Sequence, residues 1–146
     1  MTVRVSRTFD VPISQRAAWE LLSDPAKRAE AISIVERYES RGGEQNEMTW
    51  HVRLPIPAVD RTFSITTRDL ERDPPRFVKF EGRSRMLDVV GEHELTATDD
   101  GTRVENRFVV QSKIPGVERF FKRNLDDELE NIKRALHDHI DDGPDE

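Results

Sequence analysis

The hydrophobic pattern changes its period once along the chain, and this change constrains the fold more than any other feature. From about residue 34 to residue 113, apolar residues recur at every second position, as they do around Trp50. From Val117 to Ile140 they recur every three or four positions. A period of two predicts half-buried strands, and the longer period predicts one amphipathic helix of about 24 residues, ~36 Å long.

Turn residues divide the first region into separate strands. Gly42-Gly43, Pro55, Pro74-Pro75 and Asp100-Gly101 each interrupt the alternation. We expect strands at residues 34–40, 47–54, 63–73, 77–84, 89–97 and 104–110. Because short turns join them, they should form an antiparallel meander. The apolar stripe of the helix that follows consists of Val117, Phe121, Leu125, Leu129, Ile132, Leu136 and Ile140.

The N-terminal segment predicts a strand at residues 3–9 followed by two short helices. Ser14 is a good N-cap for a helix at residues 15–22. Asp24-Pro25 is a second start signal, a capping side chain followed by proline in the first turn. This second helix is expected to end near Ala31.

These elements predict one α+β domain at residues 1–142, with about seven antiparallel strands. A sheet with one apolar face must bury that face, and the C-terminal helix is the element long enough to cover it. We therefore expect a twisted sheet that curves around this helix, with space between them for side chains or a ligand. Residues 143–146 are expected to form a frayed acidic tail.

Composition limits the possible partners and location. The chain of 146 residues has no cysteine, which excludes disulfides and thiolate metal sites, and its net charge of −6 disfavours nucleic acid as the main partner. No apolar run approaches the roughly 18 residues of a membrane span. We expect a soluble, cytoplasmic protein without stable membrane insertion, and the sequence leaves its oligomeric state open.

The opening residues carry a family resemblance. Phe9-Asp10-Val11-Pro12, followed by the run from Ala18 through Trp19 to Asp24-Pro25, resembles the start of the START-like (SRPBCC) superfamily. This superfamily has the helix-grip fold and includes birch-pollen-allergen-like proteins and polyketide cyclases. Among its branches, the chain looks most like small polyketide-cyclase-like or carbon-monoxide-dehydrogenase-subunit-G-like proteins. The resemblance implies a binding site for a small hydrophobic molecule between the sheet and the C-terminal helix.

His93 and Asn106 are the candidate polar residues of such a site. His93 shares a strand face with Gly91 and Leu95, so a neutral imidazole there could act as a general base or orient a carbonyl group. It could equally be a core histidine bonded to a neighbour, or face outward. Asn106 is expected on an inward face, and its amide then needs a ligand, a water molecule or His93 as partner. We predict His93 as the catalytic residue if the chain is an enzyme.

Aromatic residues are expected to form the apolar wall of the site. These candidates are Trp50, Phe63, Phe80, Phe108, Phe120 and Phe121. They suit either a filled core or a pocket for a flat ligand. Gly91 could mark a bulge or make room in the cavity. Four arginines, at positions 61, 68, 83 and 85, could border a pocket mouth or protect a solvated strand edge.

The chain contains no nucleotide-binding glycine loop, no Gly-x-Ser-x-Gly motif and no His-Glu-x-x-His motif, so we expect neither a cofactor nor a metal. Three functions remain open. The first is binding or transport of a lipid, isoprenoid or polyketide-like molecule. The second is a cyclase or dehydratase that uses His93 as base. The third is an interaction or assembly module with a filled core, which should expose an apolar patch.

Overall fold

The computed structural model describes residues 2–32, 34–44, 46–54 and 62–142. The predicted order of strands and helices is confirmed. In chain order the elements are β1 (Thr2–Val11), α1 (Gln15–Leu22), α2 (Pro25–Glu30), β2 (Val35–Gly42), β3 (Glu47–Val52), β4 (Phe63–Asp73), β5 (Phe77–Arg83), β6 (Leu87–Thr98), β7 (Gly101–Ser112) and α3 (Val117–Asp142). The predicted tail at residues 143–146 lies outside the described residues.

All seven strands form one antiparallel sheet, in the order β1-β7-β6-β5-β4-β3-β2. The strands from β2 to β7 follow one another as the predicted meander. The first strand then pairs with the last, from Thr2 opposite Gln111 to Val11 opposite Thr102. The two edges of the sheet are therefore β1 and β2, and the other strands are paired on both sides.

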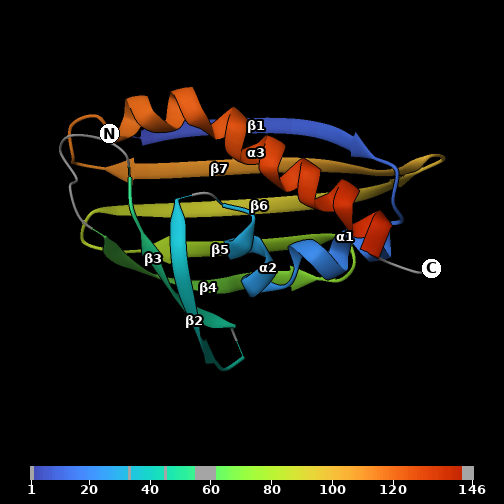
Figure 1. Cartoon of the computed structure of the whole chain (residues 1–146), viewed down its shortest axis with the longest axis horizontal. Coiled ribbons are helices and arrows are strands. Elements are labelled where there is room, and N and C mark those ends of the chain that lie inside the picture. The colour runs from blue at the N-terminus through green and yellow to red at the C-terminus, as the bar shows by residue number, and fades with distance from the viewer. Residues whose placement is uncertain (1, 33, 45, 55–61, 143–146) are drawn as a thin grey trace.

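The three helices lie on the same face of the sheet (Figure 1). α3 runs along β1 and β7, while α1 and α2 lie nearer β6 and β2. Strands β2 and β3 cross the view steeply compared with β4 to β7, so the sheet curls toward the helical side. This is the helix-grip arrangement that the hydrophobic pattern predicted.

Buried and exposed residues alternate along the strands, and the buried ones form a core between the sheet and the helices. On β7, Val104, Asn106 and Phe108 are buried, whereas the residues between them are partly exposed. From α3 the core receives Val117, Phe120, Phe121, Ile132 and Leu136. The predicted stripe residues Leu125, Leu129 and Ile140 lie outside the described side chains. No helix in the described part of the chain has both the length and the apolar character needed to cross a membrane.

Both predicted helix caps are present. The Ser14 hydroxyl accepts a hydrogen bond from the Ala17 amide at 3.1 Å. The Asp24 carboxylate accepts from the amides of Ala26 and Lys27 at the start of α2, directly before Pro25. Such caps typically stabilise a helix by about 1 kcal/mol. The second cap matters for the site, because it fixes the short helix that carries a buried arginine.

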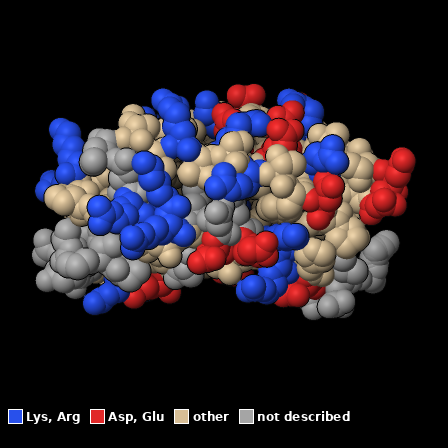
Figure 2. Space-filling view, turned by 90° about the horizontal axis from the view of Figure 1, so that it is seen from above, with Lys and Arg blue, Asp and Glu red and all other residues tan. Residues whose placement is uncertain are grey.

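The surface above α3 carries both signs of charge. Figure 2 shows basic side chains gathered over the end where α3 begins, with acidic side chains more frequent toward its other end. Arg119, Lys122 and Arg123 are exposed in the first turns of α3. Charge is therefore unevenly distributed over this face of the molecule.

Candidate functional site

An apolar cavity of about 60 Å³ lies between the sheet and α3. Its walls come from the loop after α2, from strands β3 to β7 and from α3. The lining residues are Ile32, Ile34, Trp50, Val52, Ile65, Phe80, Leu87, Val89, Phe108, Val110, Phe121 and Ile132. All are hydrophobic, so this cavity excludes charged groups and favours an apolar molecule.

Four of the predicted aromatic residues line this cavity: Trp50, Phe80, Phe108 and Phe121. The other two do not. Phe63 is partly buried and packs against the core, while Phe120 is buried edge-to-face against Phe121, with ring centroids 5.2 Å apart.

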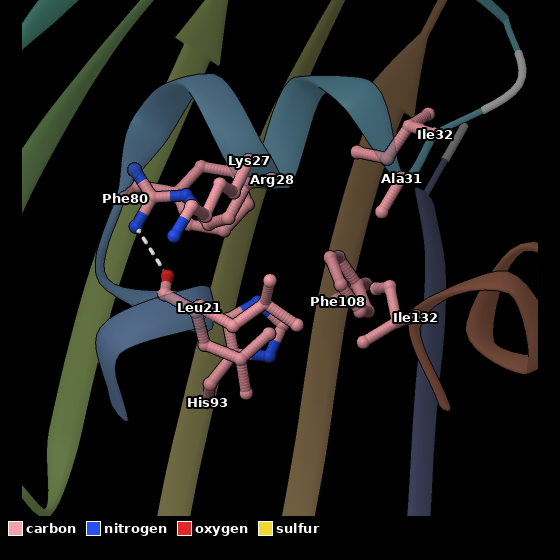
Figure 3. A pocket seen from close by; sticks show the side chains of 10 residues that line it. Leu21, Lys27, Arg28, Ala31, Ile32, Phe80, His93, Phe108 and Ile132 are labelled. Carbon is pink, nitrogen blue, oxygen red and sulfur yellow. Dashed lines mark hydrogen bonds between the residues drawn. The ribbon is translucent and has the colours of Figure 1, made fainter. Parts of the chain in front are cut away.

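A second, much smaller cavity of about 10 Å³ lies beside α1 and α2. This volume is roughly that of one water molecule. It is lined by Leu21, Leu22, Lys27, Arg28, Ala31, Ile32, Phe80, His93, Phe108 and Ile132. Ile32, Phe80, Phe108 and Ile132 border both cavities. Figure 3 shows Arg28 and His93 toward one end of this pocket and Ile32, Phe108 and Ile132 toward the other.

Gly91 allows two aromatic rings to lie between these cavities. A Cβ atom at this position would lie 2.5 Å from the Phe80 ring and 2.9 Å from the Phe108 ring. Any larger residue would therefore displace one or both rings. The two rings meet edge-on with centroids 6.5 Å apart. Of the two roles considered for Gly91, room within the cavity region is the one that the packing supports.

His93 faces inward and is hydrogen-bonded to Asn106. This is the core histidine bonded to a neighbour that the sequence left open as an alternative. The side chain is 1% exposed, and its Nδ1 lies 2.8 Å from Oδ1 of Asn106 on the adjacent strand. The Nδ2 of Asn106 donates to the Arg7 carbonyl at 3.3 Å, so Oδ1 must be the acceptor for the histidine. The proton of a neutral His93 therefore lies on Nδ1, which leaves a lone pair on Nε2.

The surroundings keep His93 neutral. Burial is the main cause, and the nearby positive charge of Arg28 adds to it, lowering the pKa from 6.5 to about 4. The hydrogen bond that His93 donates to Asn106 and the negative charge of Asp69 act in the opposite direction but more weakly. Phe80 stacks on the imidazole, and Phe108 meets it edge-on, at centroid distances of 6.0 and 5.8 Å. At neutral pH the ring is thus an uncharged acceptor in an aromatic setting.

Sequence reasoning missed Arg28, the charged residue of this site. It is 5% exposed, and its guanidinium lies 4.6 Å above the centre of the Phe80 ring. Nη1 donates to the Leu22 carbonyl at 3.1 Å (Figure 3), and Nη2 to Asp69 at 2.5 Å. Burial lowers the pKa of Arg28 below its ordinary value while Asp69 raises it, and the guanidinium stays charged.

Asp69 is the centre of a buried polar network. Besides Arg28, it accepts hydrogen bonds from Arg72 at 2.7 Å and from Asn46 at 3.0 Å. The sequence did contain a signal for it. Asp69 continues the inward alternation of Ile65 and Thr67 on β4, and an inward carboxylate requires a cationic partner. Nothing in the periodicity, however, points to an arginine on a six-residue helix as that partner.

Two buried nitrogens within the described residues have no hydrogen-bond partner: Nε of Arg28 and Nε1 of Trp50. Each belongs to a residue that lines one of the two cavities. Such groups cost free energy when unpaired, so each is a place where a ligand acceptor would be stabilised. No group of three or more metal-ligating side chains occurs within the described residues.

Of the predicted arginines, Arg85 is exposed in the turn between β5 and β6 and borders an open surface depression. Arg68 and Arg83 have a different environment from either one expected. Arg68 and Arg83 both pair with Glu81, at 2.6 and 3.1 Å, and neither lines the two cavities. The strand-edge interpretation is wrong, because β4 and β5 are internal strands. The arginines alternate with the buried residues of these strands, so they belong to the outer face of the sheet. Arg61 lies outside the described residues.

Solved structures with the same fold include enzymes and proteins of the START superfamily. The START superfamily protein from Mycobacterium smegmatis is 13% identical, with a TM-score of 0.74 over 95% of this chain and 97% of that chain. The Zhui aromatase/cyclase from Streptomyces sp. R1128 is 15% identical, with a TM-score of 0.72 over 96% of both chains. At these identities the similarity shows the fold.

A third structure, the di-domain aromatase/cyclase StfQ from the steffimycin biosynthetic pathway, has a TM-score of 0.74 and 14% identity. The alignment covers 97% of this chain but 52% of that one, so the chain spans about half the length of StfQ. No curated protein sequence matches significantly. Residues 2–137 match the family described as polyketide cyclase / dehydrase and lipid transport. The chain therefore belongs to this START-like family, whose members bind hydrophobic molecules or act on polyketides.

Proposed function

We propose that this protein binds a small hydrophobic molecule in the apolar cavity between the sheet and α3. The observation that carries the proposal is the lining of that cavity, which consists entirely of hydrophobic residues from five strands, α3 and the loop after α2. An interior apolar space of this kind gains free energy when an apolar ligand leaves water for it. The family match supports the same class of ligand.

The size of the cavity limits the ligand. A volume of about 60 Å³ is well below the roughly 150 Å³ of a cavity that binds benzene, so even a compact ligand such as an alkylbenzene needs lining side chains to shift. A larger polyketide would require Phe80, Phe108 or Phe121 to move. The role as an interaction module receives less support. Among the described residues Leu70, at 41% exposure, is the large hydrophobic side chain that is exposed, and a single residue is not a patch.

A cyclase or dehydratase is the second candidate, because of one observation. His93 is neutral, and Asn106 fixes its tautomer so that Nε2 has a free lone pair. A general base needs that arrangement within hydrogen-bond reach of its substrate. Under this alternative His93→Gln abolishes turnover of a polyketide-like substrate while ligand affinity remains. Under the binding proposal no such turnover exists to be lost.

Native mass spectrometry with matched variants tests the binding proposal. Val89 lines the cavity, whereas its neighbour Val90 points to the other face of the sheet. Val89→Phe should fill the cavity and Val90→Phe should not. We expect a ligand adduct, removable by organic extraction, in the wild type and in Val90→Phe but not in Val89→Phe. The same adduct in Val89→Phe would place the binding elsewhere, and no adduct in any of the three would contradict stable carriage of a ligand.

A further inference from the structure

Two nitrogen atoms of opposite hydrogen-bonding character belong to the walls of the small cavity. Nε of Arg28 is a donor, buried and without a partner among the described residues. Nε2 of His93 is the acceptor nitrogen of the ring, because Asn106 and the Arg7 carbonyl fix the proton on Nδ1. The side chains that carry this donor and this acceptor both line a space of about 10 Å³.

The size and chemistry of this space select one functional group. It holds roughly one oxygen atom, so a carboxylate or a phosphate is too large. A hydroxyl accepts from Arg28 and donates to His93, and so satisfies both groups. A carbonyl oxygen accepts from Arg28, but it has no proton to donate, so its lone pairs and the lone pair of His93 Nε2 repel each other. A hydrocarbon satisfies neither.

We infer that this cavity is the polar end of the binding site, and that it recognises a hydroxyl group on an otherwise hydrophobic ligand, such as a phenol, an enol or an alcohol. Nε of Arg28 donates a hydrogen bond to the hydroxyl oxygen, and the hydroxyl donates a hydrogen bond to Nε2 of His93. The inference rests on the proposed function, because the body of the ligand occupies the apolar cavity.

The arrangement of the two cavities suits such a ligand. They share four lining residues, and the contacting rings of Phe80 and Phe108 are two of them, so a molecule in the apolar cavity reaches the polar end when these two rings move apart. Those rings pack directly over Gly91, where the lack of a side chain leaves them room. The charge of Arg28 is already balanced by Asp69, so the site needs no anionic ligand. A neutral hydroxyl adds the hydrogen bond that Nε lacks without changing the charge of the site.

Three propyl-substituted benzenes that differ at the para position separate this inference from simple apolar binding. 4-Propylphenol offers a donor and an acceptor, 4-propylbenzaldehyde an acceptor alone, and propylbenzene neither. A purely apolar cavity favours propylbenzene, because the hydroxyl loses its hydrogen bonds to water. We expect the reverse order in calorimetric titration, with 4-propylphenol at least about tenfold tighter than propylbenzene and the aldehyde between them.

Two further readouts identify the atoms. Arg28→Met should remove most of the preference for the phenol over propylbenzene, whereas Arg68→Met, on the outer face of the sheet, should retain it. Nitrogen-15 NMR of the wild-type protein should show His93 Nε2 shifting with 4-propylphenol and not with propylbenzene, whether or not a variant folds. Equal or tighter binding of propylbenzene, with Nε2 unchanged, would overturn the inference and leave the proposed function standing. Failure of all three probes to bind would overturn both.

Discussion

His93 Nδ1 lies 2.8 Å from Oδ1 of Asn106 on the neighbouring strand, and both side chains are almost completely buried. The two residues stand directly opposite each other in the β6–β7 pairing. Because the other end of the Asn106 amide is held by the Arg7 carbonyl, the bond determines both the orientation and the tautomer of the histidine. Asn106 therefore acts on the site through His93, and it does not line either cavity.

Replacing Asn106 by leucine tests this relationship. The change leaves Nδ1–H of His93 without its acceptor, which should lower the free energy of unfolding by about 1–3 kcal/mol. Gln111→Leu, at an exposed position of the same strand, should change it by less than about 0.5 kcal/mol. Urea denaturation measures both. Equal stabilities of the two variants would show that the bond contributes nothing.

The pKa of His93 predicts a pH dependence of stability. The unfolded chain takes up a proton near pH 6.5, but the folded protein does so only near pH 4, so acid favours unfolding between these values. A shift of this size corresponds to about 3 kcal/mol, present above pH 6.5 and lost as the pH falls toward 4. Carboxylates also titrate in this window, so the wild type is compared with His93→Gln. Parallel stability curves for the two proteins from pH 7 to pH 4 would rule out a neutral buried His93.

Gly91→Ala should disturb the two rings that separate the cavities. The new methyl group would lie 2.5 Å from the Phe80 ring, well inside van der Waals contact, and such overpacking usually costs about 1–3 kcal/mol. We expect a lower midpoint of thermal unfolding and weaker binding of apolar probes. Thr96→Ala, exposed on the same strand, serves as control and should change neither quantity. Wild-type stability in Gly91→Ala would mean that Phe80 and Phe108 move aside freely.

Removal of one or the other partner of the buried Arg28–Asp69 ion pair should lower the stability of the protein by different amounts. Without Arg28, the carboxylate of Asp69 retains Arg72 and Asn46. Without the charge of Asp69, the buried guanidinium of Arg28 loses its ion-pair partner and keeps only the weaker influence of Asp24, a loss that typically costs about 3–5 kcal/mol.

Asp69→Asn should therefore destabilise the protein more than Arg28→Met, as measured by urea denaturation. Arg68→Met, which removes a partly exposed ion pair, should cost less than about 1 kcal/mol. A greater loss in Arg28→Met than in Asp69→Asn would contradict the charge assignment.

The fold follows from local signals that act within a few residues. The caps at Ser14 and Asp24, the alternation along the strands and the helical stripe after Pro115 each determine one element. Short turns then leave the meander as the simplest topology. Pairing of β1 with β7 joins residues about 100 positions apart, and no local signal in the sequence predicted it.

The site was predictable to a smaller extent. Alternation correctly placed His93 and Asn106 inward, because a strand reverses its side chains at every residue. It did not distinguish aromatic residues that border the cavity, such as Trp50, from one that packs beside it, Phe120. It also missed Arg28, because the burial of that side chain depends on how α2 docks against β4 and β5, a contact between elements distant in sequence.

An NMR titration of the ligand-free protein with propylbenzene tests most directly whether the space between the sheet and α3 is a binding site. Binding there should produce saturable chemical-shift changes at Val89, Phe108 and Phe121, which line the cavity, and little change at Val90 or Val109 on the other face. Val89→Phe should abolish these changes. Shifts that fail to saturate, that lie on the outer face of the sheet, or that persist unchanged in Val89→Phe would contradict a ligand-binding cavity in this protein.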